Sequence, residues 1–80
     1  MPEISRNGDK DSRNDTKISS STVYINNQSV LKDDDLDTRG DIMVGSSNDV
    51  FVENKGVCRK GDLDSRGDVL VGASSDVFAN

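Results

Sequence analysis

One stretch of this chain is written twice. The segment DLDTRGDIMVGSSNDVFV, at 35–52, returns 27 residues later as DLDSRGDVLVGASSDVFA, at 62–79. Twelve of the eighteen positions are identical, and the other six are mild changes such as Ile42 to Val69. A period of this length is typical of repeat architectures, in which similar units pack on one another. The repeat therefore limits the fold more than any other feature of the sequence.

A third, more divergent copy lies upstream. Its charged residues stand 26 positions before their counterparts in the second copy, and they are Asp9, Asp11, Arg13 and Asp15. After a shift of one residue, Val23 and Tyr24 lie 27 positions before Val50 and Phe51. The three copies, at about 5–31, 32–58 and 59–80, fill nearly the whole chain. They predict one domain over 1–80, built from three similar units that cannot bury their apolar faces individually.

The apolar residues predict short strands. Val23, Tyr24 and Ile25 favour β-structure, and Asn26-Asn27 suits the positive φ angles of a tight hairpin turn. In the second copy we expect a longer connection, 53–56, between strands at 50–52 and 57–59. The third copy stops at Asn80, where its turn would begin.

Two further apolar triplets, at 42–44 and 69–71, are long enough for short strands but not for helices. No window has a sustained helical period. The predicted fold class is therefore all-β, with three similar hairpin-bearing units arranged around an axis.

The composition limits the size of the core and the classes of function that fit the chain. Apolar residues make up 31% and aromatic residues 4% of the 80 residues, which is little material for a core. Intrinsic disorder is the alternative for so polar a chain, but the regular placement of apolar triplets argues against it. The net charge of −5 argues against nucleic-acid binding, which needs a basic surface.

No catalytic or disulfide chemistry is visible. Cys58 is the single cysteine and the chain has no His, so an internal disulfide and a mixed zinc site are excluded, and nothing activates the thiol. The carboxylates have no spacing that selects an acid and base pair. The N-terminal residues lack the apolar region of a Sec-type signal, and no apolar run is long enough to cross a bilayer. We expect a protein that is not an enzyme.

The acidic loops allow several interpretations of their function. Residues 62–69 follow the start of an EF-hand loop, but Arg66 stands where an oxygen ligand is needed and Ala73 where a bidentate Glu is needed. A looser site for a hard cation, made jointly by Asp11, Asp37 and Asp64, stays open. The favoured interpretation is that Asp and Arg pair with each other within each loop at the surface.

The tripeptide Arg-Gly-Asp occurs at 39–41 and at 66–68. Its occurrence at equivalent positions is explained by the turn that each unit needs, with Gly for backbone freedom and Asp for a bond to the backbone. The alternative function is a small secreted cation-binding or adhesion module that uses these acidic loops.

The ordered series of motifs resembles the repeat of the PAAR family of spike-tip proteins. The residues that carry the resemblance are Gly40, Ile42, Gly45, Ser46, 50–52, Asn54, 56–59, Gly61 and Asp62. The resemblance implies a small cone of three hairpin-bearing units with pseudo-three-fold symmetry. It implies that the broad base caps the trimeric β-helical central spike of a contractile phage tail, pyocin or type VI secretion machine, with one copy per trimer. The location would be the tip of that spike on the virion or secretion apparatus, and the pointed end would meet the target cell membrane.

One departure concerns the metal. Family members typically hold zinc or iron near the apex through three His and a Cys, and this chain has no His. Cys58 belongs by alignment to a hairpin and not to an apical loop. No cofactor is expected, and the sequence leaves open whether an ion lies at the apex. The candidate apex residues are Asp11, Arg13, Asp37, Arg39, Asp64 and Arg66.

The candidate partner surface follows from strand alternation. In each unit the outer two residues of a triplet share one face, and the middle residue points the other way. The inner face, with Val23 and Ile25 and their counterparts in 50–52 and 77–79, would fill the interior. The other face presents Tyr24, Phe51 and Phe78. With Val50 and Val77 beside them, these aromatic residues are candidates for a three-point contact with a three-fold partner; simple surface exposure is the alternative.

Overall fold

The structure, a computed structural model, describes residues 2–80, and its regular elements are short β-strands. They are β1 (Lys17–Ile18), β2 (Tyr24–Ile25), β3 (Gln28–Ser29), β4 (Leu36–Asp37), β5 (Phe51–Val52) and β6 (Lys55–Gly56). Over 2–80 there is no helix, and so none that is long and apolar enough to cross a membrane. The prediction of an all-β fold is confirmed.

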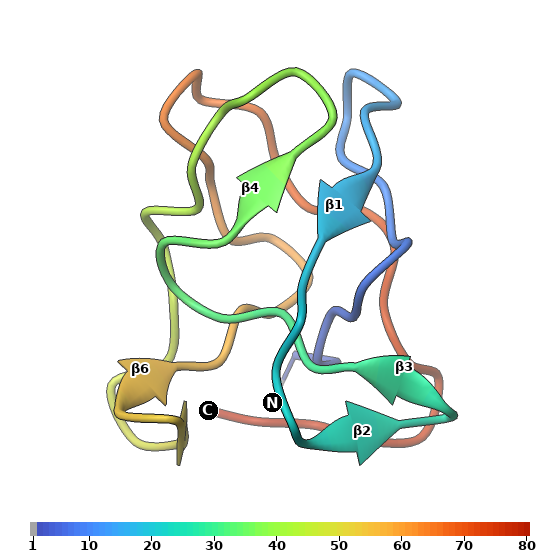
Figure 1. Cartoon of the computed structure of the whole chain (residues 1–80), viewed down its shortest axis with the longest axis vertical. Coiled ribbons are helices and arrows are strands. Elements are labelled where there is room, and N and C mark those ends of the chain that lie inside the picture. The colour runs from blue at the N-terminus through green and yellow to red at the C-terminus, as the bar shows by residue number, and fades with distance from the viewer. Residues whose placement is uncertain (1) are drawn as a thin grey trace.

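The strands form three antiparallel pairs, β1 with β4, β2 with β3 and β5 with β6. The β2–β3 and β5–β6 hairpins lie at one end of the molecule, and three loops extend from the other end (Figure 1). We call the first end the base and the second the apex. The apical loops are 11–15, 37–41 and 64–68.

Both complete hairpins turn through two residues. Asn26 and Asn27 have φ of 54° and 65°, and Glu53 and Asn54 have φ of 54° and 67°. Positive φ at both central positions is the type I′ geometry, whose twist matches that of the flanking strands. The turn at Asn26-Asn27 is confirmed. The expected longer connection over 53–56 is wrong, because Lys55–Gly56 already pairs with Phe51–Val52 as β6.

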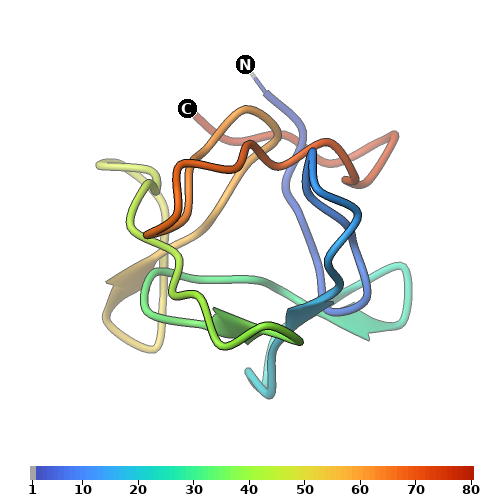
Figure 2. The ribbon, with the colours of Figure 1, turned by 90° about the horizontal axis from the view of Figure 1, so that it is seen from above.

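The third hairpin position is filled by both ends of the chain. Phe78 forms a β-bridge with Glu3, and the Ala79 N–H donates to the Pro2 carbonyl at 3.0 Å. This pairing corresponds to Tyr24 with Ser29 and Phe51 with Gly56 in the two complete hairpins. The N- and C-terminal segments therefore lie side by side at the base (Figure 2).

The prediction of strands at 42–44 and 69–71 is wrong. Ile42, Met43, Val69 and Leu70 instead make isolated bridges. Each of these residues pairs with a different segment from the residue next to it, so no strand with two consecutive pairs forms.

A ring of backbone hydrogen bonds joins the three units. The Leu31 N–H donates to Ser5 O at 3.0 Å, the Cys58 N–H donates to Leu31 O at 2.9 Å, and the Ser5 N–H donates to Cys58 O at 3.0 Å. The three residues occupy the same position in the three copies. Seen from above, the chain runs as a triangle around a central axis (Figure 2).

The buried apolar residues form two clusters, and each cluster draws on all three units. The lower cluster contains Ile4, Val30, Val57 and Ala79, and the upper one contains Leu31, Met43, Cys58 and Leu70. All eight are at most 5% exposed. Because every unit contributes to each cluster, a chain with few apolar residues still obtains a closed core.

The hairpin geometry makes a prediction about Asn54. Asn54→Gly should leave the free energy of unfolding unchanged or slightly higher, since Gly adopts positive φ without strain. Asn54→Val should lower it by about 1–2 kcal/mol, because a branched side chain is strained in the left-handed region. Urea unfolding of the two variants checks this. Equal stability of the Val and Gly variants would contradict the two-residue turn.

Candidate functional site

Each apical loop is held by one aspartate at its start. Oδ1 of Asp37 accepts the backbone N–H groups of Arg39 and Asp41, both at 2.9 Å. Asp11 and Asp64 bind the corresponding N–H groups of their own loops in the same way. Such side-chain to backbone bonds are the reason that Asp favours tight turns. The turns also need positive φ, which Asn14 (73°), Gly40 (91°) and Gly67 (90°) provide.

The second carboxylate oxygens of these aspartates point to the axis, where they meet the ammonium group of Lys17. Nζ lies 3.0 Å from Oδ2 of Asp11, 3.0 Å from Oδ2 of Asp37 and 2.8 Å from Oδ2 of Asp64. The Lys17 side chain is 1% exposed, and the three aspartate side chains are fully buried. One cation from the first unit thus joins carboxylates from all three units, and we call this group the Lys17 cluster.

The repeat explains why Lys17 reaches the axis. Lys17 stands 26 positions before Met43, which stands 27 before Leu70. In each unit this position pairs with the aspartate of the next loop: Lys17 with Asp37, Met43 with Asp64 and Leu70 with Asp11.

Lys17 is not among the site residues predicted from the sequence. The signal was present in the repeat alignment, as a lysine at a position that is apolar in the other two copies. A charged residue at a repeat position that is apolar in the other copies indicates one of two things. Either it has a buried partner of opposite charge, or this copy exposes the position to solvent.

The ionisation of this cluster follows from its hydrogen bonds. Burial by itself lowers the pKa of Lys17, but the contacts with Asp64, Asp37 and Asp11 outweigh it and the net effect is a raised pKa. Burial also acts to raise the pKa of Asp37 and Asp64. The bonds from Lys17 and from the loop N–H groups outweigh it and hold both pKa values below the usual range. The ammonium and these two carboxylates are therefore ionised at neutral pH.

A second ring of charges lies around the first and joins neighbouring loops. Arg39 binds Asp15 at 3.0 Å, Arg66 binds Asp41 at 3.1 Å and Arg13 binds Asp68 at 3.3 Å. These pairs connect each loop to the next. The expected pairing of Asp with Arg within each loop is therefore wrong: the loops lie side by side around the axis, and the neighbouring loop is the nearer partner.

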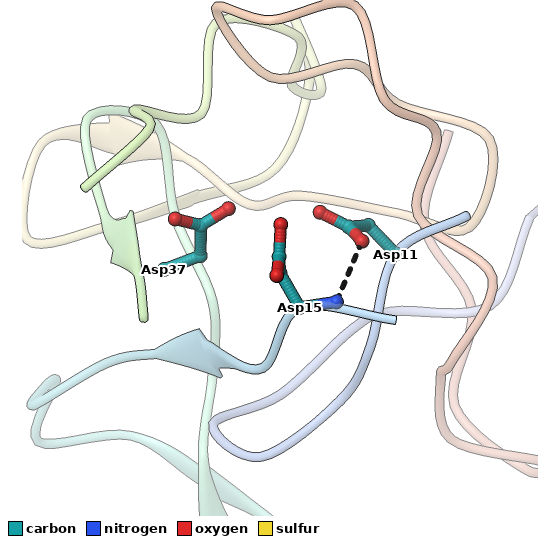
Figure 3. A group of neighbouring side chains, drawn as sticks. All are labelled: Asp11, Asp15 and Asp37. Carbon is teal, nitrogen blue, oxygen red and sulfur yellow. Dashed lines mark hydrogen bonds between the residues drawn. The ribbon is translucent and has the colours of Figure 1, made fainter. Parts of the chain in front are cut away.

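The two rings are in contact, as Figure 3 shows for Asp11, Asp15 and Asp37. Oδ1 of Asp11 accepts the Asp15 N–H at 3.0 Å, and carboxylate oxygens of the three residues lie within 4.8 Å of one another. The three aspartates proposed from sequence for a joint cation site, Asp11, Asp37 and Asp64, thus do meet. The cation that the structure places among them is an ammonium.

The charged side chains of both Arg-Gly-Asp tripeptides are engaged at the apex. Arg39 and Arg66 bind aspartates of the preceding loop, and Asp41 accepts the bond from Arg66. Integrin-type recognition would have to break these pairs, so the geometry does not favour the adhesion reading.

The residues present do not fit the zinc or iron site that the resemblance implies. The chain has no His. Cys58 is buried in the upper cluster, its thiol donates to Gly45 O at 3.4 Å, and burial raises the pKa of the thiol. Around the axis at the apex the donors are carboxylates, which suit hard cations rather than zinc or iron in a His and Cys site.

The base presents the aromatic residues chosen from sequence. Tyr24, Phe51 and Phe78 are 63%, 58% and 45% exposed. Val50, at 38%, is exposed beside Phe51, while Val77 is half-buried against the lower cluster.

The inner face of the hairpins is only partly as predicted. Ile25 and Val52 pack against the lower cluster and Ala79 belongs to it. Val23 and Val50 are exposed, so their placement in the interior is wrong. The regular strands begin one residue later, at Tyr24 and Phe51, and alternation applies only from there.

Comparison of the sequence with protein-family models gives no match, and comparison with curated proteins gives none either. Two features of the molecule thus stand as candidates: the charged apex around Lys17 and the aromatic base.

The first site prediction concerns Lys17. Lys17→Met should lower the free energy of unfolding by about 3–5 kcal/mol, because it leaves three buried carboxylates without their cation. Lys60→Met, which removes an exposed lysine, should change it by less than about 0.5 kcal/mol. Urea unfolding at pH 7 measures both. Similar losses in the two variants would contradict a structural role for the cluster.

The second prediction concerns pH. The depressed pKa values of Asp37 and Asp64 contribute stability that is present above the ordinary aspartate pKa of about 3.9 and is lost as the pH falls through the folded-state values. The raised pKa of Lys17 contributes stability that is present below the ordinary lysine pKa of about 10.4 and is lost as the pH rises through the folded-state value.

Thermal unfolding against pH should therefore show a plateau with losses at both extremes. The difference between the native chain and Lys17→Met should shrink as the carboxylates become protonated in acid. A difference that stays constant down to pH 2 would show that the cluster does not cause the acid loss.

Proposed function

We propose that this chain is a structural tip protein of the PAAR-repeat type. It caps the trimeric β-helical central spike of a contractile injection apparatus, such as a phage tail baseplate or a type VI secretion machine, and sharpens the spike for membrane piercing without catalysis. The observation that carries this function is the set of three equivalent aromatic side chains exposed at one end of a chain that winds around a three-fold axis.

The base is suited to a three-fold partner. Tyr24, Phe51 and Phe78 stand at equivalent positions in three β-paired segments, and all three are close to or above half exposed. Aromatic residues are enriched at the centres of interfaces, where they contribute much of the binding energy. Because one chain already repeats its surface three times, a single copy matches one trimer.

The apex is suited to enter the envelope of the target cell ahead of the spike. Its three loops are fixed at their starts by Asp11, Asp37 and Asp64, and they are joined to one another by the ring of Arg–Asp pairs. Lys17 connects the loops from inside. Since each loop is tied both to its own turn and to its neighbours, the apex resists local deformation under load.

Stoichiometry tests the proposal. The chain is mixed with a purified trimeric β-helical spike from the same source, and the complex is weighed by native mass spectrometry. The expected result is one chain per spike trimer. Three chains per trimer, or no complex, would contradict the function.

A pair of matched variants tests the surface. Phe51→Asp with Phe78→Asp should weaken capping by at least about 30-fold, the loss of one interface hot spot, while the spike stays trimeric. Leu36→Asp with Leu63→Asp makes the same change at equivalent positions, 48% and 44% exposed, that adjoin the apical aspartates. This control should bind like the native chain. Equal losses in the two variants would remove the aromatic base from the proposal.

A further inference from the structure

The outer strand of the first hairpin at the base has one edge without a strand partner. β2 has β3 as its one neighbour among the described residues. The Val30 N–H donates to Val23 O at 2.9 Å, and Ile25 is opposite Gln28 next to the turn. Antiparallel pairs alternate between bonded and non-bonded positions. The N–H and C=O of Tyr24, which lies between these pairs, therefore point away from β3.

The other two units repeat this arrangement. The Val57 N–H donates to Val50 O at 3.0 Å, so Phe51 lies at the position that is not bonded to β6. Phe78 lies between two bonds that join residues 77 and 79 to the N-terminal segment. Thus β2, β5 and 77–79 each have one free edge. In every case the free N–H and C=O belong to the residue whose aromatic side chain is exposed.

The inner strands of the same pairs are bonded further into the molecule. Their carbonyl groups accept N–H groups at 2.7–2.9 Å, in the pairs Ser29 with Asn7, Gly56 with Asp33 and Glu3 with Lys60. In Figure 1, β2 lies below β3 at the lower limit of the molecule. The backbone bonds of the base therefore end at the three outer strands, whose free edges face away from the apex.

We propose that the three free edges bind extended strands of a three-fold partner, so that each pair at the base gains a third strand. This inference rests on the proposed function and specifies how the spike is recognised. A free strand edge is a template for pairing with another chain, and the main-chain bonds contribute affinity. Interstrand bonds run perpendicular to the strands, and the strands of a β-helix lie across its axis. The end of a trimeric β-helix therefore presents edges of the same kind.

The shortness of the edges makes them selective for a partner that presents three strands at once. Both β2 and β5 are two residues long, so a single added strand makes few bonds and is not stable in water. The backbone ring among Ser5, Leu31 and Cys58 holds the three units in one body. Once one edge is paired, the other two are held close to their partners, and the three contacts strengthen one another.

Acidic side chains beside the edges argue against a second copy of the chain as the partner. Asp49 and Asp76 are exposed and stand two residues before the aromatic residue of their units. At the equivalent position in the first unit, Thr22 donates to the carboxylate of Glu53 at 2.8 Å. Two bases placed face to face would bring these carboxylates together, and like charges repel. A spike with basic residues around its end is complementary.

The first experiment removes backbone donors and keeps the side chains. The full 80-residue chain is made by chemical synthesis with the N–H of Phe51 and of Phe78 replaced by an ester oxygen. Binding to the purified trimeric β-helical spike from the same source should weaken by at least about 10-fold. The unfolding midpoint should stay within about 2 °C of the native value, because neither N–H bonds within the chain.

The matched control is the same ester at Leu63, whose exposed side chain adjoins an apical aspartate. This chain should bind like the native one. Native-like binding by the double ester would overturn the strand-addition proposal and leave the capping function intact. A native chain that does not bind the spike would overturn both.

Amide hydrogen exchange followed by NMR tests the unaltered chain. In the free chain, the amides of Tyr24, Phe51 and Phe78 should exchange at least about 100-fold faster than those of Val30 and Val57, which donate across the hairpins. In the complex with the spike, the three amides should become protected. Burial of the aromatic side chains without this protection would show a contact through side chains alone and would overturn the proposal.

Native mass spectrometry of the chain alone tests the choice of partner. The expected species is a monomer. A dimer that the two esters abolish would show that the free edges bind a second copy, and it would overturn the assignment of the edges to the spike.

Discussion

The contact between Lys17 and three aspartates is the interaction on which the apex depends. An isolated carboxylate in a dry interior is costly, and three of them at one axis repel one another. The ammonium 2.8–3.0 Å from each reverses this balance. Because the same aspartates use their other oxygen to fold the loops, the central charge and the loop conformations are coupled. Removal of the cation therefore threatens three loops together.

A second structure, a ring of backbone hydrogen bonds, joins the three units without any charged side chain. The hydrogen bonds among Ser5, Leu31 and Cys58 close a ring in which each unit donates to one neighbour and accepts from the other. No side-chain chemistry is needed for that ring, which explains why a serine, a leucine and a cysteine serve equally well at one repeat position. The side chains of those residues are buried around the axis. A polar chain thus obtains its core because all three units contribute to each cluster.

The two ends of the molecule differ in chemistry. The apex has rings of aspartates, arginines and one lysine, with each loop held by its neighbours. The base has exposed aromatic side chains on short hairpins. A charged, cross-linked end and an apolar, three-fold end are the two surfaces that a capping tip needs, one for the envelope and one for the partner. The proposed function rests on this polarity together with the repeat.

The sequence by itself determined the three units, the all-β class, the turn at Asn26-Asn27 and the outward position of Tyr24, Phe51 and Phe78. These follow from period, propensity and alternation, which are local properties of the chain. It also brought the three inner aspartates together, since equivalent residues meet near a three-fold axis.

Only the tertiary structure decided which charges pair. The arginines bind the neighbouring loop rather than their own, because closure around the axis places that loop nearer. The two ends of the chain complete a hairpin across 75 residues, from Glu3 to Phe78, a pairing that no local pattern specifies. The role of Lys17 as the central cation could not be predicted either. The sequence shows only one lysine at a position that is apolar in the other two copies. Its ammonium lies between three carboxylates because Lys17 pairs with Asp37 in the sheet.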